Sequence, residues 1–191
     1  MPQPRSAFLA LLCALAVIGT SSALGRILRS HAHAHQASVC GPGSLMPSRS
    51  DIARIARVTL CLINRQRAAH RLAPLRYNAA LGRAARGHSV DMVVHGYFSH
   101  ASRDGGSPFA RIYQSGYVSP SHACALGENI AAGMGTLGTP AAIVHAWMNS
   151  PLHRANILDS DYRDTAVGVA YGYPGSNSGG ATFTEDFGRR C

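Results

Sequence analysis

Two long segments in the first half of the chain carry apolar residues three or four positions apart, which is the spacing of one helical face. The first follows Ser50, a residue suited to capping a helix, and continues to about His70. The second follows Pro74, has Asn78 as its cap and ends at Gly96. The two stripes are Ile52, Ile55, Thr59, Leu62 and Ile63, and then Leu81, Ala85, His88, Met92 and His95. Each segment is predicted to be a helix with one buried face.

Proline marks the start of two shorter helices. Ser107-Pro108 and Thr139-Pro140 each place a capping residue before a proline at the first helical position. The first of these helices is predicted to end at Gly116 and the second at about Asn149, with a further short turn at residues 152–157. The middle of the chain is therefore expected to remain helical.

The pattern changes to a β-prone one near the C-terminus. Residues 166–173 and 182–187 alternate or run as strands do, and a turn rich in glycine, serine and proline lies between them. We expect a hairpin here, with a further short strand near residues 128–132. Helices followed by an antiparallel pair indicate an α+β or sandwiched fold, not an alternating parallel one.

The N-terminal residues 1–23 have the composition of a secretory signal peptide. Arg5 supplies a positive charge, residues 7–18 are apolar, and small residues lead up to a cleavage point after Ala23. Twelve apolar residues are too few to span a bilayer, but the moderately apolar residues 19–28 keep an uncleaved anchor as the alternative. We therefore expect a secreted or cell-envelope protein with no transmembrane domain after cleavage.

Between the leader and the domain lies a segment with linker composition. We assign residues 24–49 to this linker and residues 50–191 to the domain, with folding expected to begin near Cys40. Histidine alternates with alanine in residues 31–35. Three such histidines can bind a metal ion when the chain is extended. We favour the interpretation that this segment is a solvated linker without a metal.

Four cysteines remain once the leader is removed, namely Cys40, Cys61, Cys124 and Cys191. An even number in an exported chain indicates two disulfides, with three connectivities open. We favour Cys40–Cys61, which would pin the N-terminal segment to the first helix, and Cys124–Cys191, which would hold the last residue. Loop closure gives these bonds about 3 and about 4 kcal/mol. A zinc knuckle is the competing interpretation, and no CxxC pair supports it.

Composition adds a strong positive charge. The 191 residues include 18 basic ones, all arginine, against 9 acidic ones, for a net charge of +9. A hydrophobic content of 46% with only 14% charged residues excludes a disordered chain or a coiled coil. A cationic surface suits anionic lipids or phosphate-bearing polymers. Export and the lack of a recognition motif argue against a nucleic-acid partner.

Three polar residues at the ends of predicted segments are the candidates for chemistry: His100, Glu128 and His153. The chain has no phosphate loop, dinucleotide fingerprint, nucleophile elbow or HExxH helix. Two imidazoles and one carboxylate can hold zinc and leave a position open for water. Gaps of 28 and 25 residues do not by themselves bring the three together.

Five motifs in order make the candidates specific. They are LINRQR at 62–67, GYFSH at 96–100, GENIA at 127–131, AWMNSP at 146–151 and HRANIL at 153–158. Together they resemble the CAP superfamily of cysteine-rich secretory proteins, antigen 5 and pathogenesis-related proteins, in its short bacterial SCP-like form. The resemblance covers residues 50–188 and implies a three-layer α-β-α sandwich with a central cleft.

The family cleft is lined by two histidines and two glutamates. The resemblance assigns its first histidine to His100, its first glutamate to Glu128 and its second histidine to His153. Ser150 stands where the second glutamate is expected, so the cleft is predicted to be one carboxylate short. Glu128 alone can orient an imidazole or act as a base, but it cannot form a carboxylate pair of the glycosidase type.

Several other polar residues receive structural interpretations. Glu185 falls where bacterial relatives more often carry glutamine, and we expect a solvent-facing or edge position in preference to the cleft. His88 is expected to be a satisfied, half-buried histidine, and His95 is explained by its place near a helix C-terminus. Asn129 and Asn156 are expected to bond the backbone of turns.

The resemblance favours a non-enzymatic, extracellular binding module. Sterol or lipid binding is described for several family members, so we expect a lipid, sterol or anionic envelope polymer as the partner and a divalent metal, Zn²⁺ first, in the cleft. The alternative is a zinc-assisted hydrolase in which His100 and His153 hold the metal and Glu128 activates water, with Ser150 as a poor third ligand. A structural protein with a vestigial cleft is the third hypothesis. The oligomeric state stays open.

Overall fold

The computed structural model describes residues 40–191. The predicted leader, the alternative anchor and the histidine run all fall outside the described residues. Residues 40–49, which were assigned to the linker, pack on the domain. The Gly43 carbonyl accepts a hydrogen bond from the Ala141 backbone N–H at 2.9 Å, and Leu45 packs against the main core.

Five α-helices and two short 3-10 helices, η1 (Pro120–His122) and η2 (Gly135–Gly138), occur in the described part of the chain. The α-helices are α2 (Ile52–Ala69), α3 (Ala79–His95), α4 (Pro108–Gln114), α5 (Pro140–Asn149) and α6 (Pro151–Leu158). The Asn78 side chain caps α3 as predicted, and Gly96 ends it with a left-handed φ of 68°. A serine and a threonine before N1 prolines cap α4 and α5. The predicted cap Ser50 is one residue early, because Asp51 precedes α2 and makes no side-chain cap bond.

Four described strands form one sheet in the order β1-β3-β4-β2. They are β1 (Arg76–Tyr77), β2 (Ala123–Met134), β3 (Asp164–Tyr173) and β4 (Ser176–Arg190). The predicted hairpin is β3–β4, and the predicted third strand is the longer β2, antiparallel to β4. The predicted antiparallel strands are joined by one parallel edge strand, because β1 pairs with Asp164 and Thr165 of β3. Two residues are too few to produce a recognisable alternation.

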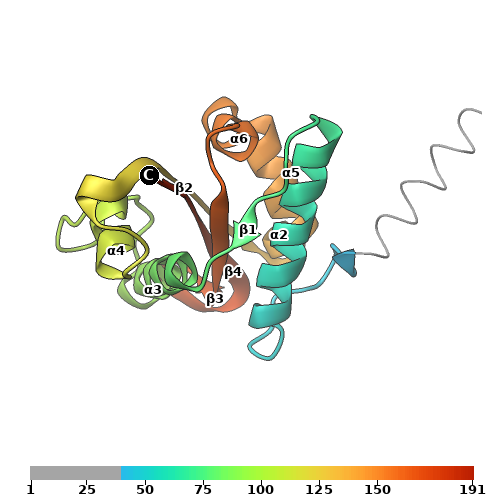
Figure 1. Ribbon diagram of the computed structural model, residues 1–191. Helices are drawn as coiled ribbons and strands as arrows, with labels where there is room; N and C mark the ends of the chain where they lie inside the picture. The colour runs from blue at the N-terminus through green and yellow to red at the C-terminus, as the bar shows by residue number, and fades with distance from the viewer. Residues whose placement is uncertain (1–39) are drawn as a thin grey trace, which may run out of the picture. The chain divides into compact units, whose positions relative to one another are not determined.

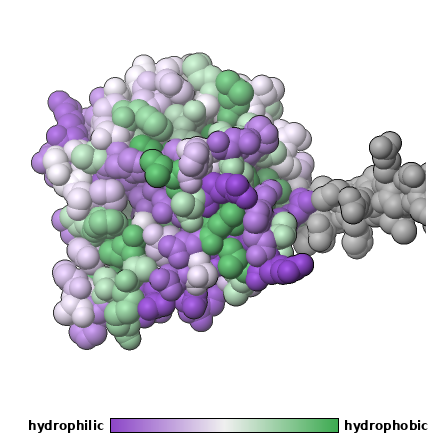
Figure 2. Space-filling view, turned by 90° about the horizontal axis from the view of Figure 1, so that it is seen from above, coloured by the Kyte–Doolittle hydropathy of each residue, from purple (hydrophilic) through white to green (hydrophobic). Residues whose placement is uncertain are grey.

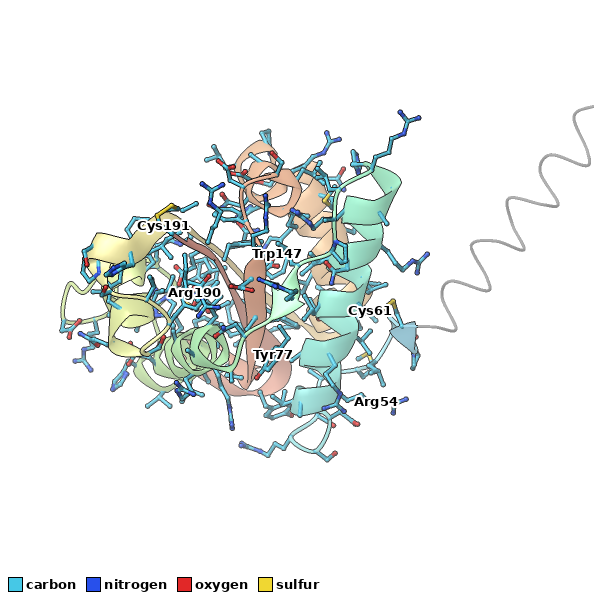
Figure 3. The ribbon with its side chains drawn as sticks, viewed as in Figure 1. Arg54, Cys61, Tyr77, Trp147, Arg190 and Cys191 are labelled. Carbon is cyan, nitrogen blue, oxygen red and sulfur yellow. A yellow bond between two sulfur atoms is a disulfide. The ribbon has the colours of Figure 1, made fainter. Side chains whose placement is uncertain are left out.

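The sheet lies between two layers of helices, so the domain is an α-β-α sandwich (Figure 1). Helices α2, α5 and α6 cover one face, and α3 with α4 covers the other (Figure 1). Trp147 of α5 is only 1% exposed and donates its indole N–H to the Ile130 carbonyl at 3.1 Å, as expected for a core residue (Figure 3). On the other face α3 approaches so closely that a Cβ on Gly168 would lie 2.1 Å from the Arg86 backbone nitrogen.

Both predicted disulfides are present. Cys40–Cys61 joins the N-terminal segment to α2 over 21 residues, and Cys124–Cys191 joins β2 to the last residue over 67 residues. The second bond therefore closes the β2–β4 pair at the end where β4 finishes.

Candidate functional site

His100 and Glu128 are in direct contact. Glu128 lies on β2 with 2% of its side chain exposed, whereas His100 follows α3 and is 52% exposed. The Nδ1 atom of His100 lies 2.8 Å from Oε1 of Glu128. The fold therefore brings together two of the predicted cleft residues that the sequence separates by 28 positions.

His153 lies in the first turn of α6, which two asparagines hold against the edge strand β2. The Asn129 amide donates to the His153 carbonyl at 3.2 Å, and the Asn156 amide donates to the Glu128 carbonyl at 3.2 Å. Both asparagines thus bond backbone groups, as expected. Desolvation, and secondly the charge of nearby His100, lowers the pKa of His153. All three predicted residues therefore meet at one edge of the sheet.

Ser150 orients His153. Its Oγ lies 2.8 Å from Nδ1 of His153. Each imidazole is therefore held through Nδ1, His100 by Glu128 and His153 by Ser150. Among the described residues, nothing hydrogen-bonds either Nε2 atom, so both can face a ligand.

Arg111 of α4 completes the surroundings of Glu128, and the sequence did not reveal it. Its Nη2 donates to Oε2 of Glu128 at 2.6 Å and to the His100 carbonyl at 2.9 Å, while Nη1 donates to Ser102 Oγ at 2.8 Å. Both carboxylate oxygens of Glu128 are thus engaged. One arginine among 18 offers no local signal for this role.

A second buried carboxyl lies opposite Glu128. Asp186 is 1% exposed and pairs with Glu128 in the β2–β4 register, which places both side chains on one face of the sheet. Desolvation and then the negative charge of Glu128 raise the pKa of Asp186 well above its usual value. The carboxyl that is missing at Ser150 therefore has a counterpart on β4.

The expected solvent-facing or edge position of Glu185 is wrong, because this side chain is fully buried on an interior strand. Its Oε1 accepts a hydrogen bond from Thr165 Oγ1 at 3.3 Å, and the Asn129 side chain is a further partner. Burial raises the pKa of Glu185 to about 8, although the positive charge of Arg67 opposes the shift. Glu185 points to the face opposite Asp186, so it does not join the cleft.

His88, on α3, contacts the segment that carries His100. It is 1% exposed, more buried than predicted, and its Nε2 lies 2.8 Å from the Ser99 carbonyl. This contact fixes the backbone next to His100. The expectation that His88 is satisfied is only half right, because its buried Nδ1 has no hydrogen-bond partner among the described residues. Desolvation, and then the charge of Arg111, lowers the pKa of His88. His95 lies in the last turn of α3 as expected, with its Nδ1 2.7 Å from the carboxylate of an aspartate one turn earlier.

The predicted cleft residues carry two imidazoles whose Nε2 atoms a metal ion could use. Their Nδ1 atoms are oriented by a carboxylate and a hydroxyl, an arrangement common behind metal-binding histidines. Within residues 40–191, no group of three or more histidine, cysteine, aspartate or glutamate side chains is placed to hold a metal. Zinc at His100 and His153 would therefore need water or a bound ligand to complete its usual four positions.

The fold is similar to solved structures of bacterial surface proteins. An extracellular protein containing an SCP domain from Bacillus anthracis aligns with a TM-score of 0.61 at 28% identity, over 74% of this chain and 44% of that one. An outer surface protein from Borrelia burgdorferi aligns with a TM-score of 0.60 at 20% identity, over 71% of this chain and 92% of that one. The second likeness concerns the fold alone.

Two curated relatives come from Bacillus subtilis strain 168. The uncharacterized protein YkwD is 39% identical over 127 residues, which are 66% of this chain and 46% of YkwD. The uncharacterized membrane protein YlbC is 42% identical over 110 residues, which are 58% of this chain and 30% of YlbC. The chain spans less than half the length of either relative. A family model described as the cysteine-rich secretory protein family, CAP, matches residues 60–187. Motifs, sandwich and family match agree, and the chain belongs to the cysteine-rich secretory protein (CAP) family.

Proposed function

We propose that the chain is an exported, non-enzymatic binding module and that the cleft around His100, Glu128 and His153 is its ligand site. The double engagement of Glu128 carries this proposal, because Oε1 meets His100 and Oε2 meets Arg111. A carboxylate held by two partners positions the imidazole but is poorly placed to take a proton from water. This geometry supports binding over general-base hydrolysis.

We propose a phosphate-bearing envelope component as the ligand, either a lipid head group or an anionic polymer. The net charge of +9, carried by arginine, supports an anionic partner, since guanidinium groups match phosphate oxygens. The unengaged edges of His100 and His153 add donors at the cleft. On the face shown in Figure 2, hydrophobic side chains form small groups among hydrophilic ones.

Export is supported by the leader-like residues 1–23 and by the similar proteins. One of those proteins, from Bacillus anthracis, is described as an extracellular protein containing an SCP domain. Of the helices that the structure describes, none has the length and apolar character needed to cross a membrane.

Binding to vesicles and to a soluble polymer tests the ligand class. The probes are vesicles of phosphatidylcholine alone, with phosphatidylglycerol or with cholesterol, and poly(glycerol phosphate) in solution. We expect the full chain to bind the phosphatidylglycerol vesicles or the polymer. The double variant His100→Ala, His153→Ala should bind at least tenfold more weakly, because the cleft donors are lost. The N-terminal segment is the same in both proteins, so its contribution cancels.

The matched control is His122→Ala, His145→Ala, which removes two exposed histidines outside the cleft. It should bind as the parent does. Equal binding by the cleft variant would show that surface arginines act alone, and cholesterol-dependent binding would replace the phosphate ligand with a sterol. The two phosphate probes separate a lipid from a polymer source.

The alternative function is a zinc-assisted hydrolase, favoured by the two oriented imidazoles. In this alternative His100 and His153 would hold zinc, and the metal would lower the pKa of a water molecule bound to it. Calorimetric titration with zinc should use a chain carrying His31→Ala, His33→Ala and His35→Ala, so that the histidine run cannot compete. Binding that disappears with His100→Ala, His153→Ala would support the metal site. If zinc binds but peptide, ester and glycan panels give no product, the hydrolase is excluded.

A further inference from the structure

A groove follows the part of the β3 edge that β1 leaves unpaired, at the edge of the sheet opposite β2. Strand β1 pairs only with Asp164 and Thr165 of β3, and no other described strand pairs with this edge. Two cavities of about 590 and 280 Å³ lie along it. Residues 167–169 of β3 line the first and residues 169–171 line the second. The groove therefore accompanies five consecutive strand residues.

Helices α2 and α3 form the two walls of this edge groove. Small residues line both walls and leave space between them, namely Ala53 and Ala56 on α2 and Gly82 on α3. Apolar contact area comes from Ile52 and from Val90, which is 40% exposed. Figure 3 shows the β1 end of the same region, with Tyr77 between the two helices. The groove is thus lined by short apolar side chains together with longer arginine and tyrosine side chains.

The backbone of β3 has its hydrogen-bonding groups turned toward the groove. The backbone nitrogens of Arg76 and Asn78 donate to the carbonyls of Arg163 and Thr165, each at 2.9 Å. Because a strand repeats every two residues, the N–H and C=O groups at positions 167 and 169 point to the same side. β1 has ended there, so no described strand pairs with these groups. Val167 and Val169 are 7% and 2% exposed, so an added strand must displace the side chains that flank the groove before it can pair with them.

The charged residues lining the groove are all basic. Arg49 and Arg57 line it from the α2 side and Arg86 from α3, with no aspartate or glutamate in either cavity lining. The Arg49 guanidinium lies 4.9 Å above the Tyr171 ring, so this charge is fixed at one end of the groove. An occupant with carboxylates would therefore be favoured by charge as well as by shape.

We propose that the edge groove binds an extended acidic peptide segment of another protein, which adds to β3 as an extra strand. Its backbone would pair with the groups at positions 167 and 169, its apolar side chains would contact the alanine-lined wall, and its carboxylates would meet the arginines. A five-residue segment is about 16 Å long, which suits the groove. This function is separate from the one proposed for the His100 cleft.

Two other occupants fit the observations less well. An acyl chain would fill the groove but would leave the edge N–H and C=O groups without partners. The chain's own residues 1–39 carry three arginines and no aspartate or glutamate, so their charge repels the groove. Backbone pairing and charge together favour an acidic peptide supplied in trans.

The first test uses a fluorescein-labelled heptapeptide of alternating glutamate and valine as the probe. We expect saturable binding to the full chain, and at least tenfold weaker binding when lysine replaces glutamate. Two further probes are N-methylated, one at the valines and one at the glutamates. In an added strand, the N–H groups of either the valines or the glutamates face β3, but not both. One methylated probe should therefore bind at least tenfold more weakly, and the other should bind like the unmethylated peptide. Equal binding of all three glutamate peptides would overturn the proposal.

Variants of the protein locate the site. Ala53→Trp, which fills the groove, and Arg86→Glu, which reverses a lining charge, should each weaken binding at least tenfold. The control is Arg54→Glu, also exposed on α2 but outside the groove lining (Figure 3), and it should weaken binding less than threefold. The cleft variant His100→Ala, His153→Ala should bind the peptide normally, which separates this result from that of the phosphate ligand.

Amide hydrogen exchange supplies a direct readout. The amides of Val167 and Val169 should exchange at least tenfold more slowly when the peptide is bound, because they become paired. As a competitor, sodium oleate tests the acyl alternative. If oleate displaces the peptide and the two amides are no slower in the peptide complex, the groove is an acyl-chain site and the proposal is wrong.

Discussion

Glu128 on β2 and Asp186 on β4 are cross-strand partners, and both side chains are buried on the same face of the sheet. Arg111 lies 2.6 Å from Glu128 and neutralises one negative charge there. A second charge would have no such partner, which is why the pKa of Asp186 is raised, first by desolvation and then by Glu128. The site therefore combines a salt-bridged Glu128 with a buried Asp186 whose pKa is raised.

Arg111→Ala should destabilise the domain by about 3 kcal/mol or more, because it leaves the Glu128 carboxylate buried without its cation. Urea unfolding at pH 7 measures the loss. Arg103→Ala, at an exposed position between α3 and α4, should change stability by less than about 0.5 kcal/mol. Adding Glu128→Gln to Arg111→Ala should recover part of the loss. Similar small effects of both arginine variants would contradict this account.

Glu185→Gln should raise stability at pH 8 relative to the parent and change it little near pH 4. The folded chain keeps the Glu185 proton up to a pKa of about 8, whereas the unfolded chain releases it near the usual 4.5. The folded state thus binds more protons across this window, so stability falls as pH rises, by up to about 1.4 kcal/mol per pH unit.

Unfolding of parent and Glu185→Gln from pH 4 to pH 9 checks this dependence. The parent should lose stability between about pH 4.5 and pH 8, and the variant should have a flatter profile. Asp186 is shifted in the same direction, so adding Asp186→Asn should flatten the profile further. Parallel profiles for parent and Glu185→Gln would show that this carboxyl is not protonated in the fold.

Two glycine-to-alanine substitutions should act in opposite directions. Gly168→Ala forces a Cβ against the backbone of α3 at Arg86, at 2.1 Å, and should cost several kcal/mol or prevent folding. Gly87→Ala adds a methyl group where no heavy atom lies within 4 Å, inside α3, and should stabilise by about 0.5–1 kcal/mol. Thermal unfolding of both variants measures the difference. Tolerance of alanine at position 168 would place α3 farther from the sheet.

Removing either disulfide should destabilise the domain, with the larger effect from the longer loop. Cys124→Ser, Cys191→Ser should cost about 4 kcal/mol and Cys40→Ser, Cys61→Ser about 3 kcal/mol, by the entropy of loop closure. Urea unfolding under non-reducing conditions compares them. The reverse order would show that contacts near Cys40 matter more than loop length.

Most helices could be predicted because their signals are local. Caps such as Asn78, terminators such as Gly96 and apolar spacing depend on residues within a few positions of one another. The two-residue β1 could not be found, since its pairing with Asp164 and Thr165 lies almost ninety residues away and leaves no pattern of its own. Strand order is likewise a property of long-range packing.

Only those residues of the candidate site that lie in the family motifs could be predicted from the sequence. His100, Glu128 and His153 came from the family resemblance, but Arg111 and Asp186 depend on how α4 packs and on the register of β2 with β4. Glu185 was misplaced for a related reason. Neighbours on a strand face opposite ways, and both faces of β4 are covered by helices, so a polar residue there is buried on either side.

The disulfide between Cys124 and Cys191 closes one end of the β2–β4 ladder and leaves the other end without a covalent link. It fastens β2 to the chain end where Ala123 pairs with Arg190, while the other end of the ladder, from Met134 to Gly180, has no covalent closure. We therefore expect opening of edge strand β2 to begin at Met134 and to proceed toward Glu128. The buried carboxyl pair Glu128 and Asp186 lies between the disulfide and the end that opens first, so a short opening at Met134 leaves it paired.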